Sequence, residues 1–283
     1  MSDVDALLPP AIAARAEEIG VQKANSPAFA LFALAVLAGA FIALGAAFST
    51  VVATAPGVPF GVHRLLIGLS FCLGLVLVIV GGAELFTGNN LIAMAWASRR
   101  IGTRALLRNW GIVLAGNAAG AIGTVLLVDA AGLHSLAGEA VGQTAVRIAA
   151  AKCALSPLEA YSRGILCNAL VCLAVWQSYG ARSTVDRIAV VIFPVTAFVA
   201  MGLEHSIANL YFLPAGILAA EDLTPAALAQ ALSALPTDAL PTWGRALANL
   251  IPVTLGNIVG GTVLVAAVYW AVYRRGVKDE PSE

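Results

Sequence analysis

The chain alternates long apolar runs with short polar connections, and six of the runs are long enough to form membrane-spanning helices. They fall at about residues 28–53, 65–97, 109–130, 160–179, 188–219 and 247–273. A helix crosses the roughly 30 Å hydrocarbon core of a bilayer in about 20 residues. The pattern therefore predicts an all-α polytopic membrane protein with six transmembrane helices.

The second and fifth runs are too long for one simple helix, and polar residues and glycine interrupt each of them near its middle. The interruptions read GGAELFTGNN, from Gly81, and GLEHSIANLY, from Gly202. Non-helical backbone at membrane depth is tolerated only where protein or a water-filled cavity covers it. We therefore expect the second and fifth helices to be broken at these two points.

The two halves of the chain repeat each other around these interruptions. Gly82, Glu84 and Asn89 match Gly202, Glu204 and Asn209 at a separation of 120 residues, and Asn109, Gly116, Asn117 and Gly120 match Asn249, Gly256, Asn257 and Gly260 at a separation of 140. Glycine matches alone could reflect close helix packing. Because each half holds three spans, the pattern predicts a 3+3 inverted repeat, with the substrate site near the membrane midplane.

The basic residues predict how the chain is oriented, because lysine and arginine accumulate on the cytoplasmic side. With the N-terminus inside, 11 of the 16 basic residues fall on the inner side, and the other five are Arg64, Arg147, Lys152, Arg163 and Arg245. Both termini are then cytoplasmic. We divide the chain into a cytoplasmic N-terminal segment at 1–25, a single transmembrane channel domain at 26–275 and a cytoplasmic tail at 276–283.

Composition supports the membrane assignment and removes several classes of function. The chain is 60% hydrophobic and 11% charged, whereas soluble domains carry about 25% charged residues. Its 16 acidic residues balance the basic ones, which flank the apolar runs and form no nucleic-acid-binding stripe. The four cysteines lack metal-ligand spacing, and the three histidines are far apart in the sequence. We therefore predict no enzyme, no cofactor and no metal site.

His205 is the ionisable residue in the interruptions that the repeat does not explain. Glu84 and Glu204 correspond, as do Asn89 and Asn209, so these four favour a shared role in capping backbone groups that the breaks expose. In the first half, however, Leu85 stands at the position of His205. Ionisable residues within a membrane mark pathways and relays, and histidine exchanges protons near neutral pH. We predict that His205 meets a small anion; a buried neutral histidine with two hydrogen bonds is the alternative.

Several other residues allow two interpretations. Lys152 precedes the fourth span and is either a solvated lysine or a charge that draws anions to a vestibule. Asn168 is a lone amide in an apolar helix, where hydrogen bonding between helices is favoured. Phe71 and Leu75 are four residues apart and share a helical face. Together with Phe198 they form either ordinary packing or a hydrophobic constriction.

Three stretches resemble the formate/nitrite transporter family. GGAELFTGN and GILCNALVCLAVW, from Gly164, are similar to its two signatures, and EHSIAN resembles the motif that carries its central histidine. The similarity extends over about residues 26–275. It implies an aquaporin-like fold, a homopentamer with a pore in each protomer, and a location in a bacterial-type inner membrane. No Asn-Pro-Ala motif of a true aquaporin occurs in the chain.

The resemblance also implies roles for individual residues. Thr87 would face His205 at the centre of the pore, Phe71 and Leu75 would line a constriction nearer one face, and Phe198 would line one on the other. The residues expected to support the histidine or the anion electrostatically are Lys152, Glu204, Asn168 and Asn209.

Together these observations predict a channel or transporter for small monovalent anions of weak acids. Formate is the expected substrate, with nitrite and hydrosulfide as alternatives in the same family and an aquaporin-type channel for neutral solutes as the alternative of another class. Between apolar constrictions a bare charge is costly. Proton transfer from or through His205 would let the neutral acid cross, which predicts pH-dependent, proton-coupled permeation.

Overall fold

The computed structural model describes residues 6–55, 57–233 and 240–276, and every secondary-structure element in these ranges is helical. In chain order the elements are α1 (Pro9–Ala24), α2 (Ala28–Ala53), α3 (Phe60–Val80), η1 (Gly88–Ile92), α4 (Ala93–Ala97), α5 (Thr103–Ala130), η2 (Leu133–Ser135), α6 (Ala140–Cys153), α7 (Pro157–Gly180), α8 (Thr184–Ala200), α9 (Ser206–Asp222), α10 (Pro225–Leu232), α11 (Trp243–Val259), η3 (Gly260–Ala267) and α12 (Val268–Tyr273). The predictions made for residues 1–5 and 277–283 lie outside the described residues.

The predicted breaks in the second and fifth helices are confirmed. The second run divides into α3 and the short helices η1 and α4, and the fifth divides into α8 and α9. Just after α3, Gly82 has a φ of 70°, and just after α8, Gly202 has a φ of 69°. Residues other than glycine are strained in this left-handed backbone conformation. The two glycines therefore let the chain leave each helix and turn in the middle of the bundle.

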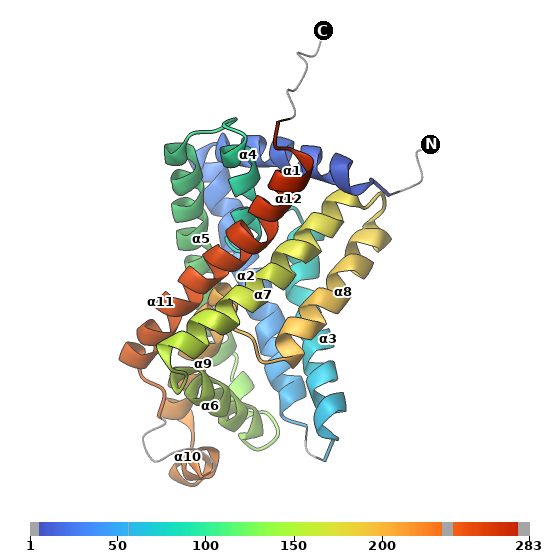
Figure 1. Cartoon of the computed structure of the whole chain (residues 1–283). Coiled ribbons are helices and arrows are strands. Elements are labelled where there is room, and N and C mark those ends of the chain that lie inside the picture. The colour runs from blue at the N-terminus through green and yellow to red at the C-terminus, as the bar shows by residue number, and fades with distance from the viewer. Residues whose placement is uncertain (1–5, 56, 234–239, 277–283) are drawn as a thin grey trace.

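The helices are long and apolar enough for a multi-pass membrane protein. The helices α2, α3, α5 and α7 and the continuous helical run Trp243–Tyr273 each meet the length and hydropathy of a membrane span. The two pieces of the fifth run, α8 and α9, have 17 residues each. Neither is long enough alone, so they cross the bundle as a pair. Figure 1 shows α1, α4 and α12 at one end of the bundle and α6 and α10 at the other.

The glycines matched by the repeat allow helices to pack closely in both halves. A Cβ atom on Gly120 of α5 would lie 1.9 Å from the carbonyl oxygen of Val36 in α2, and one on Gly260 would lie 2.1 Å from that of Ile165 in α7. Only glycine fits at such contacts, which membrane helices use to approach one another. The helices α2 and α7, which receive them, run in opposite directions through the bundle (Figure 1).

The helix α1 lies across one end of the bundle and is fixed there by a buried charge (Figure 1). The side chain of Glu17 is fully buried, and its carboxylate accepts hydrogen bonds from Nε of Arg274, at 2.9 Å, and from the hydroxyl of Ser98. Because a buried carboxylate is stable only with such partners, this contact holds α1 against the end of α12 and the turn after α4.

Candidate functional site

The two breaks meet at a contact between Thr87 and His205, both of which are buried. Oγ1 of Thr87 lies 2.9 Å from Nε2 of His205. His205 is the N-cap residue of α9, and its Nδ1 accepts a hydrogen bond from the backbone N–H of Ala208 at 3.0 Å. A nitrogen that accepts carries no proton, so the neutral ring has its proton on Nε2. That proton points toward Thr87.

Beside His205, the carboxylate of Glu204 organises a buried polar cluster. Nζ of Lys152 donates to Oε1 at 2.8 Å, and Nδ2 of Asn209 donates to Oε2 at 2.7 Å. Asn209 also donates to Oδ1 of Asn249 at 2.8 Å, and Asn249 donates to the carbonyl of Lys152 at 3.0 Å. These four residues form a closed ring of hydrogen bonds around one partly buried ion pair, which we call the Glu204 cluster.

The first half contains the same arrangement around Glu84, which we call the Glu84 cluster. Nζ of Lys23 and Nδ2 of Asn89 donate to Oε2 of Glu84 at 3.0 and 2.7 Å. Asn89 donates to Oδ1 of Asn109 at 3.0 Å, and Asn109 donates to the carbonyl of Lys23 at 3.0 Å. Lys23 therefore corresponds to Lys152.

The sequence prediction treated Lys23 only as a basic residue of the inner side. Lys23 precedes Glu84 by 61 residues, whereas Lys152 precedes Glu204 by 52, so a search at one fixed separation misses the pair. A usable signal was available: each lysine is the second-last residue of a helix that precedes the first span of its half.

Two asparagines satisfy backbone groups that the breaks expose. Oδ1 of Asn117 accepts from the N–H of Phe86 at 2.9 Å, and its Nδ2 donates to the carbonyl of Glu84 at 2.9 Å. In the second half Asn257 does the same, at 2.9 Å each, with the N–H of Ser206 and the carbonyl of Glu204. Because unsatisfied backbone groups are costly away from water, these amides hold both breaks in shape.

Asn168 of α7 also donates hydrogen bonds to backbone carbonyls. Its Nδ2 lies 3.2 Å from the carbonyl of Thr87, 2.6 Å from that of Asn257 and 2.7 Å from Oδ1 of Asn90. Among the described residues, none of its hydrogen bonds goes to His205 or Lys152. Asn168 therefore acts on the centre through the backbone position of Thr87.

Two cavities lie on opposite sides of the Thr87–His205 contact. The first, about 320 Å³ in volume, is lined by Lys152, Glu204 and His205, and we call it the Lys152 cavity. The second, about 240 Å³, is lined by Lys23, Glu84 and residues that flank Thr87, and we call it the Lys23 cavity. Each cavity thus combines a lysine–glutamate pair with an approach to the centre.

Arg64 borders the Lys152 cavity and was not predicted as a site residue. Its guanidinium donates to the carbonyls of Val199 and Ala200 at 2.6 and 2.8 Å. These carbonyls lie in the last turn of α8, where the i+4 donors of a continuing helix are missing, and that of Val199 also accepts from the N–H of Gly202 at 3.0 Å. Arg64 therefore stabilises the first edge of the second break while placing a positive charge beside the cavity.

The apolar residues are grouped differently from the expectation. The rings of Phe71 and Phe198 meet edge to face with centroids 5.6 Å apart, and both line the Lys152 cavity. Leu75 lines the Lys23 cavity together with Leu85. The expectation that Phe71 shares a side with Leu75 is therefore wrong, whereas Leu75 and Phe198 do lie on different sides. Four residues advance about 6 Å along a helix, which is enough to carry α3 past the centre.

Comparison with known proteins agrees with this architecture. The model of a family described as formate/nitrite transporter matches residues 10–271. The formate channel FocA of Escherichia coli strain K12 is 42% identical over 274 residues, with 96% of each chain covered. FocA of Haemophilus influenzae is 38% identical over 252 residues, with 88% of this chain and 89% of that one covered. A solved structure described as a pentameric formate channel with formate bound matches with a TM-score of 0.79 and 41% identity, covering 87% of this chain and 97% of that one. The chain belongs to the formate/nitrite transporter family.

Proposed function

We propose that this protein conducts small monovalent anions of weak acids across a membrane, with formate as its main substrate. The observation that carries the proposal is the Thr87–His205 contact between two cavities, each lined by a lysine–glutamate pair. The formate channels named above support the choice of formate. Nitrite and hydrosulfide, which carry the same charge, are the alternatives within this function.

The lysines attract the anion on each side. The side chain of Lys152 is 14% exposed and that of Lys23 is 22% exposed, so each reaches its cavity while remaining paired with a glutamate. Positive charge at the mouth of a narrow path raises the local anion concentration. Because the Glu84 and Glu204 clusters have the same construction, the geometry favours neither direction of transport.

At the centre the anion exchanges water for a hydrogen-bond donor of the protein. Phe71 and Phe198 narrow the path on one side, and Leu75 and Leu85 narrow it on the other. An anion that loses its hydration there needs replacement donors. When Nε2–H of His205 donates to Oγ1 of Thr87, the hydroxyl hydrogen of Thr87 is free to point at the substrate.

Permeation as the neutral acid requires a further proton. His205 can give a proton to the anion only after its ring carries a second one, and that proton must occupy Nδ1. The bond from the N–H of Ala208 to Nδ1 then opens. We propose that this opening couples proton transfer to movement at the start of α9.

The same function accounts for assembly and location. We propose a homopentamer, because the solved relative is described as pentameric and apolar side chains such as Phe29 and Phe193 stand exposed on this single chain. We also propose that it lies in a bacterial-type inner membrane with both termini cytoplasmic. We also propose that α1 works as part of the channel domain at 26–275, since Lys23 completes the Glu84 cluster. The segment 276–283 remains a predicted cytoplasmic tail.

Formate flux in proteoliposomes tests the proposal. We expect a wild-type flux that increases as the pH falls, and a small, pH-independent flux in His205→Asn. Asparagine is the matched variant because it keeps an N-cap acceptor for α9 but exchanges no proton. Wild-type pH dependence in that variant contradicts the proton relay. Glycerol flux without formate, nitrite or hydrosulfide flux contradicts anion conduction and favours a neutral-solute channel.

A further inference from the structure

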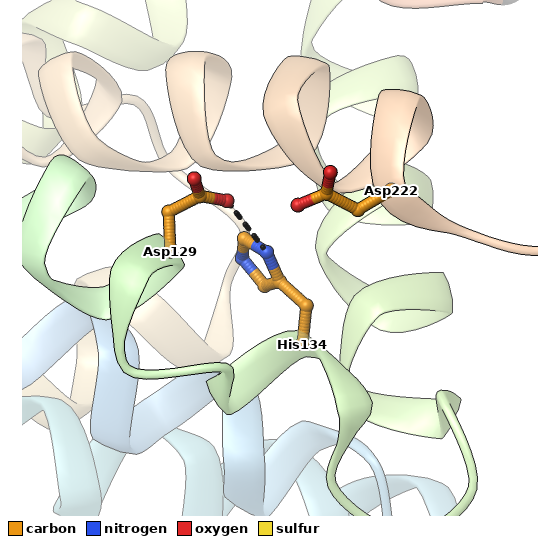
Figure 2. Close-up of side chains that lie close together, drawn as sticks. All are labelled: Asp129, His134 and Asp222. Carbon is orange, nitrogen blue, oxygen red and sulfur yellow. Dashed lines mark ion pairs between the residues drawn. The ribbon is translucent and has the colours of Figure 1, made fainter.

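Three potential metal ligands gather at the end of the bundle that carries α6, away from the Thr87–His205 contact. They are Asp129, at the end of α5, His134, in η2, and Asp222, at the end of α9 (Figure 2). One ligand atom of each lies within 4.8 Å of one ligand atom of both others. In Figure 2 the two carboxylates face the imidazole ring from either side.

His134 is the residue that points to a ligand. It is only 6% exposed, and neither ring nitrogen has a hydrogen-bond partner among the described residues. Oδ1 of Asp129 is also buried without a hydrogen bond, 3.4 Å from Nδ1 of His134. Buried polar atoms of this kind are rare because each unmade hydrogen bond is costly. A cation between the ring and the carboxylates would satisfy Nδ1 of His134 and Oδ1 of Asp129 together.

We propose that Asp129, His134 and Asp222 bind a divalent cation of the zinc type. Zinc accepts histidine nitrogen and carboxylate oxygen at about 2.0–2.2 Å, so two ligand atoms on one tetrahedral ion lie about 3.4 Å apart. Nδ1 of His134 and Oδ1 of Asp129 already have this separation. Asp222 is exposed and can adjust its side chain to close the third contact. Water would fill the fourth position.

The backbone holds the first two ligands side by side. Gly132 has a φ of 67° and its N–H donates to the carbonyl of Asp129 at 2.8 Å, which ends α5 in a tight reversal. The N–H of Ser135 then donates to the carbonyl of Gly132 at 3.1 Å. The turn thus returns His134 to Asp129, five residues earlier, without using either side chain.

A separate contact places the third ligand. The N–H and Oγ1 of Thr224 donate to the carboxylate of Glu139 at 3.1 and 2.8 Å. Glu139 directly precedes α6, and Thr224 lies two residues beyond Asp222, so this contact fixes the end of α9 near η2. The ligands are therefore positioned by hydrogen bonds that leave their own side chains available to the ion.

The ion would join the two halves of the molecule. Asp129 belongs to the first half, whereas Asp222 ends the helix whose N-cap is His205. Spacing along the chain did not reveal the site, because Asp222 follows His134 by 88 residues. The prediction of no metal site considered only ligands that lie close together in the sequence.

Calorimetric titration of the full-length, chelator-treated protein with zinc chloride, after removal of any affinity tag, tests the site. We expect one zinc ion per protomer, with binding weakened at least tenfold in His134→Gln and in Asp222→Asn. His63→Gln is the matched control, because it removes a histidine outside the cluster, and it should bind like the wild type. Zinc should also raise the melting temperature of the wild type and not that of His134→Gln.

Two outcomes overturn the proposal. The first is the absence of stoichiometric zinc binding to the wild type, and the second is unchanged binding in both His134→Gln and Asp222→Asn. If His134→Gln fails to fold, Asp222→Asn decides alone, since its side chain is exposed. A charged His134 that merely pairs with the carboxylates predicts a lower melting temperature in Asp222→Asn and no effect of zinc on any variant, which also refutes the site.

Discussion

The ion pair of Lys152 and Glu204 makes the sharpest prediction about how the channel is held together. Their atoms are 2.8 Å apart, and the side chains are 14% and 3% exposed. Lys152→Met keeps the length of the apolar stem but leaves Glu204 buried without its counter-ion. Breaking a buried pair in this way costs about 3–5 kcal/mol. Because Lys152 borders a cavity, we expect the lower end, about 3 kcal/mol.

The double variant separates unpaired charge from lost packing. Adding Glu204→Gln to Lys152→Met removes the uncompensated charge while the amide keeps a bond to Asn209, so we expect about 2 kcal/mol to return. Lys23→Met, alone and with Glu84→Gln, is the matched comparison in the other cluster. Its loss should be smaller, because Lys23 and Glu84 are 22% and 11% exposed.

The assay is reversible unfolding by sodium dodecyl sulfate in mixed micelles, followed by circular dichroism for all variants at one pH. Equal destabilisation in Lys152→Met and in the double variant would refute the reasoning, because it would show that Glu204 does not need its counter-ion. A formate flux reduced at low formate concentration in Lys152→Met would show separately that the lysine attracts the anion.

Three further changes test other parts of the site. Gly202→Ala should destabilise the protein by about 1–3 kcal/mol in the same unfolding assay, because alanine strains a φ of 69°; no loss would mean that the break relaxes. Asn257→Leu leaves the buried N–H of Ser206 and the carbonyl of Glu204 without partners. We therefore expect a loss of stability of about 2–5 kcal/mol and little folded protein by size-exclusion chromatography. A wild-type yield of folded protein would show that water replaces the amide. Phe198→Ala opens the Lys152 cavity beside His205 and should raise acetate flux relative to formate in proteoliposomes; an unchanged ratio would place the selective constriction elsewhere.

The helices and their breaks could be predicted from the sequence because the bilayer restricts what the chain can do. A span needs about 20 apolar residues, and a break inside one needs covered polar groups, so GGAELFTGNN and GLEHSIANLY stood out. The contact of Thr87 with His205 was expected only from the family resemblance. Both fall in the interruptions, but residue type alone does not say which side chains meet.

The level of a side chain along the pore, and contacts between residues far apart in the sequence, could not be predicted in this way. Phe71 and Leu75 share a helical face, yet only the level at which α3 passes the centre decides which cavity each one lines. Lys23 was missed because the loops between the matched helices differ in length. Asp129, His134 and Asp222 come together only when the ends of α5 and α9 meet beside η2, an arrangement that no local pattern encodes.

The pairing of Glu17 with Arg274 has a consequence for biogenesis. The ribosome makes α1 before any span, and the two arginine partners of its buried carboxylate follow at different times. Arg100 lies 3.8 Å from Glu17 in the turn after α4, whereas Arg274, which donates at 2.9 Å, is synthesised 257 residues after Glu17. Until Arg274 is made, Glu17 lacks its closer counter-ion. A nascent chain halted before α12 would therefore hold α1, and the Lys23 that α1 delivers to Glu84, less firmly than the complete chain does.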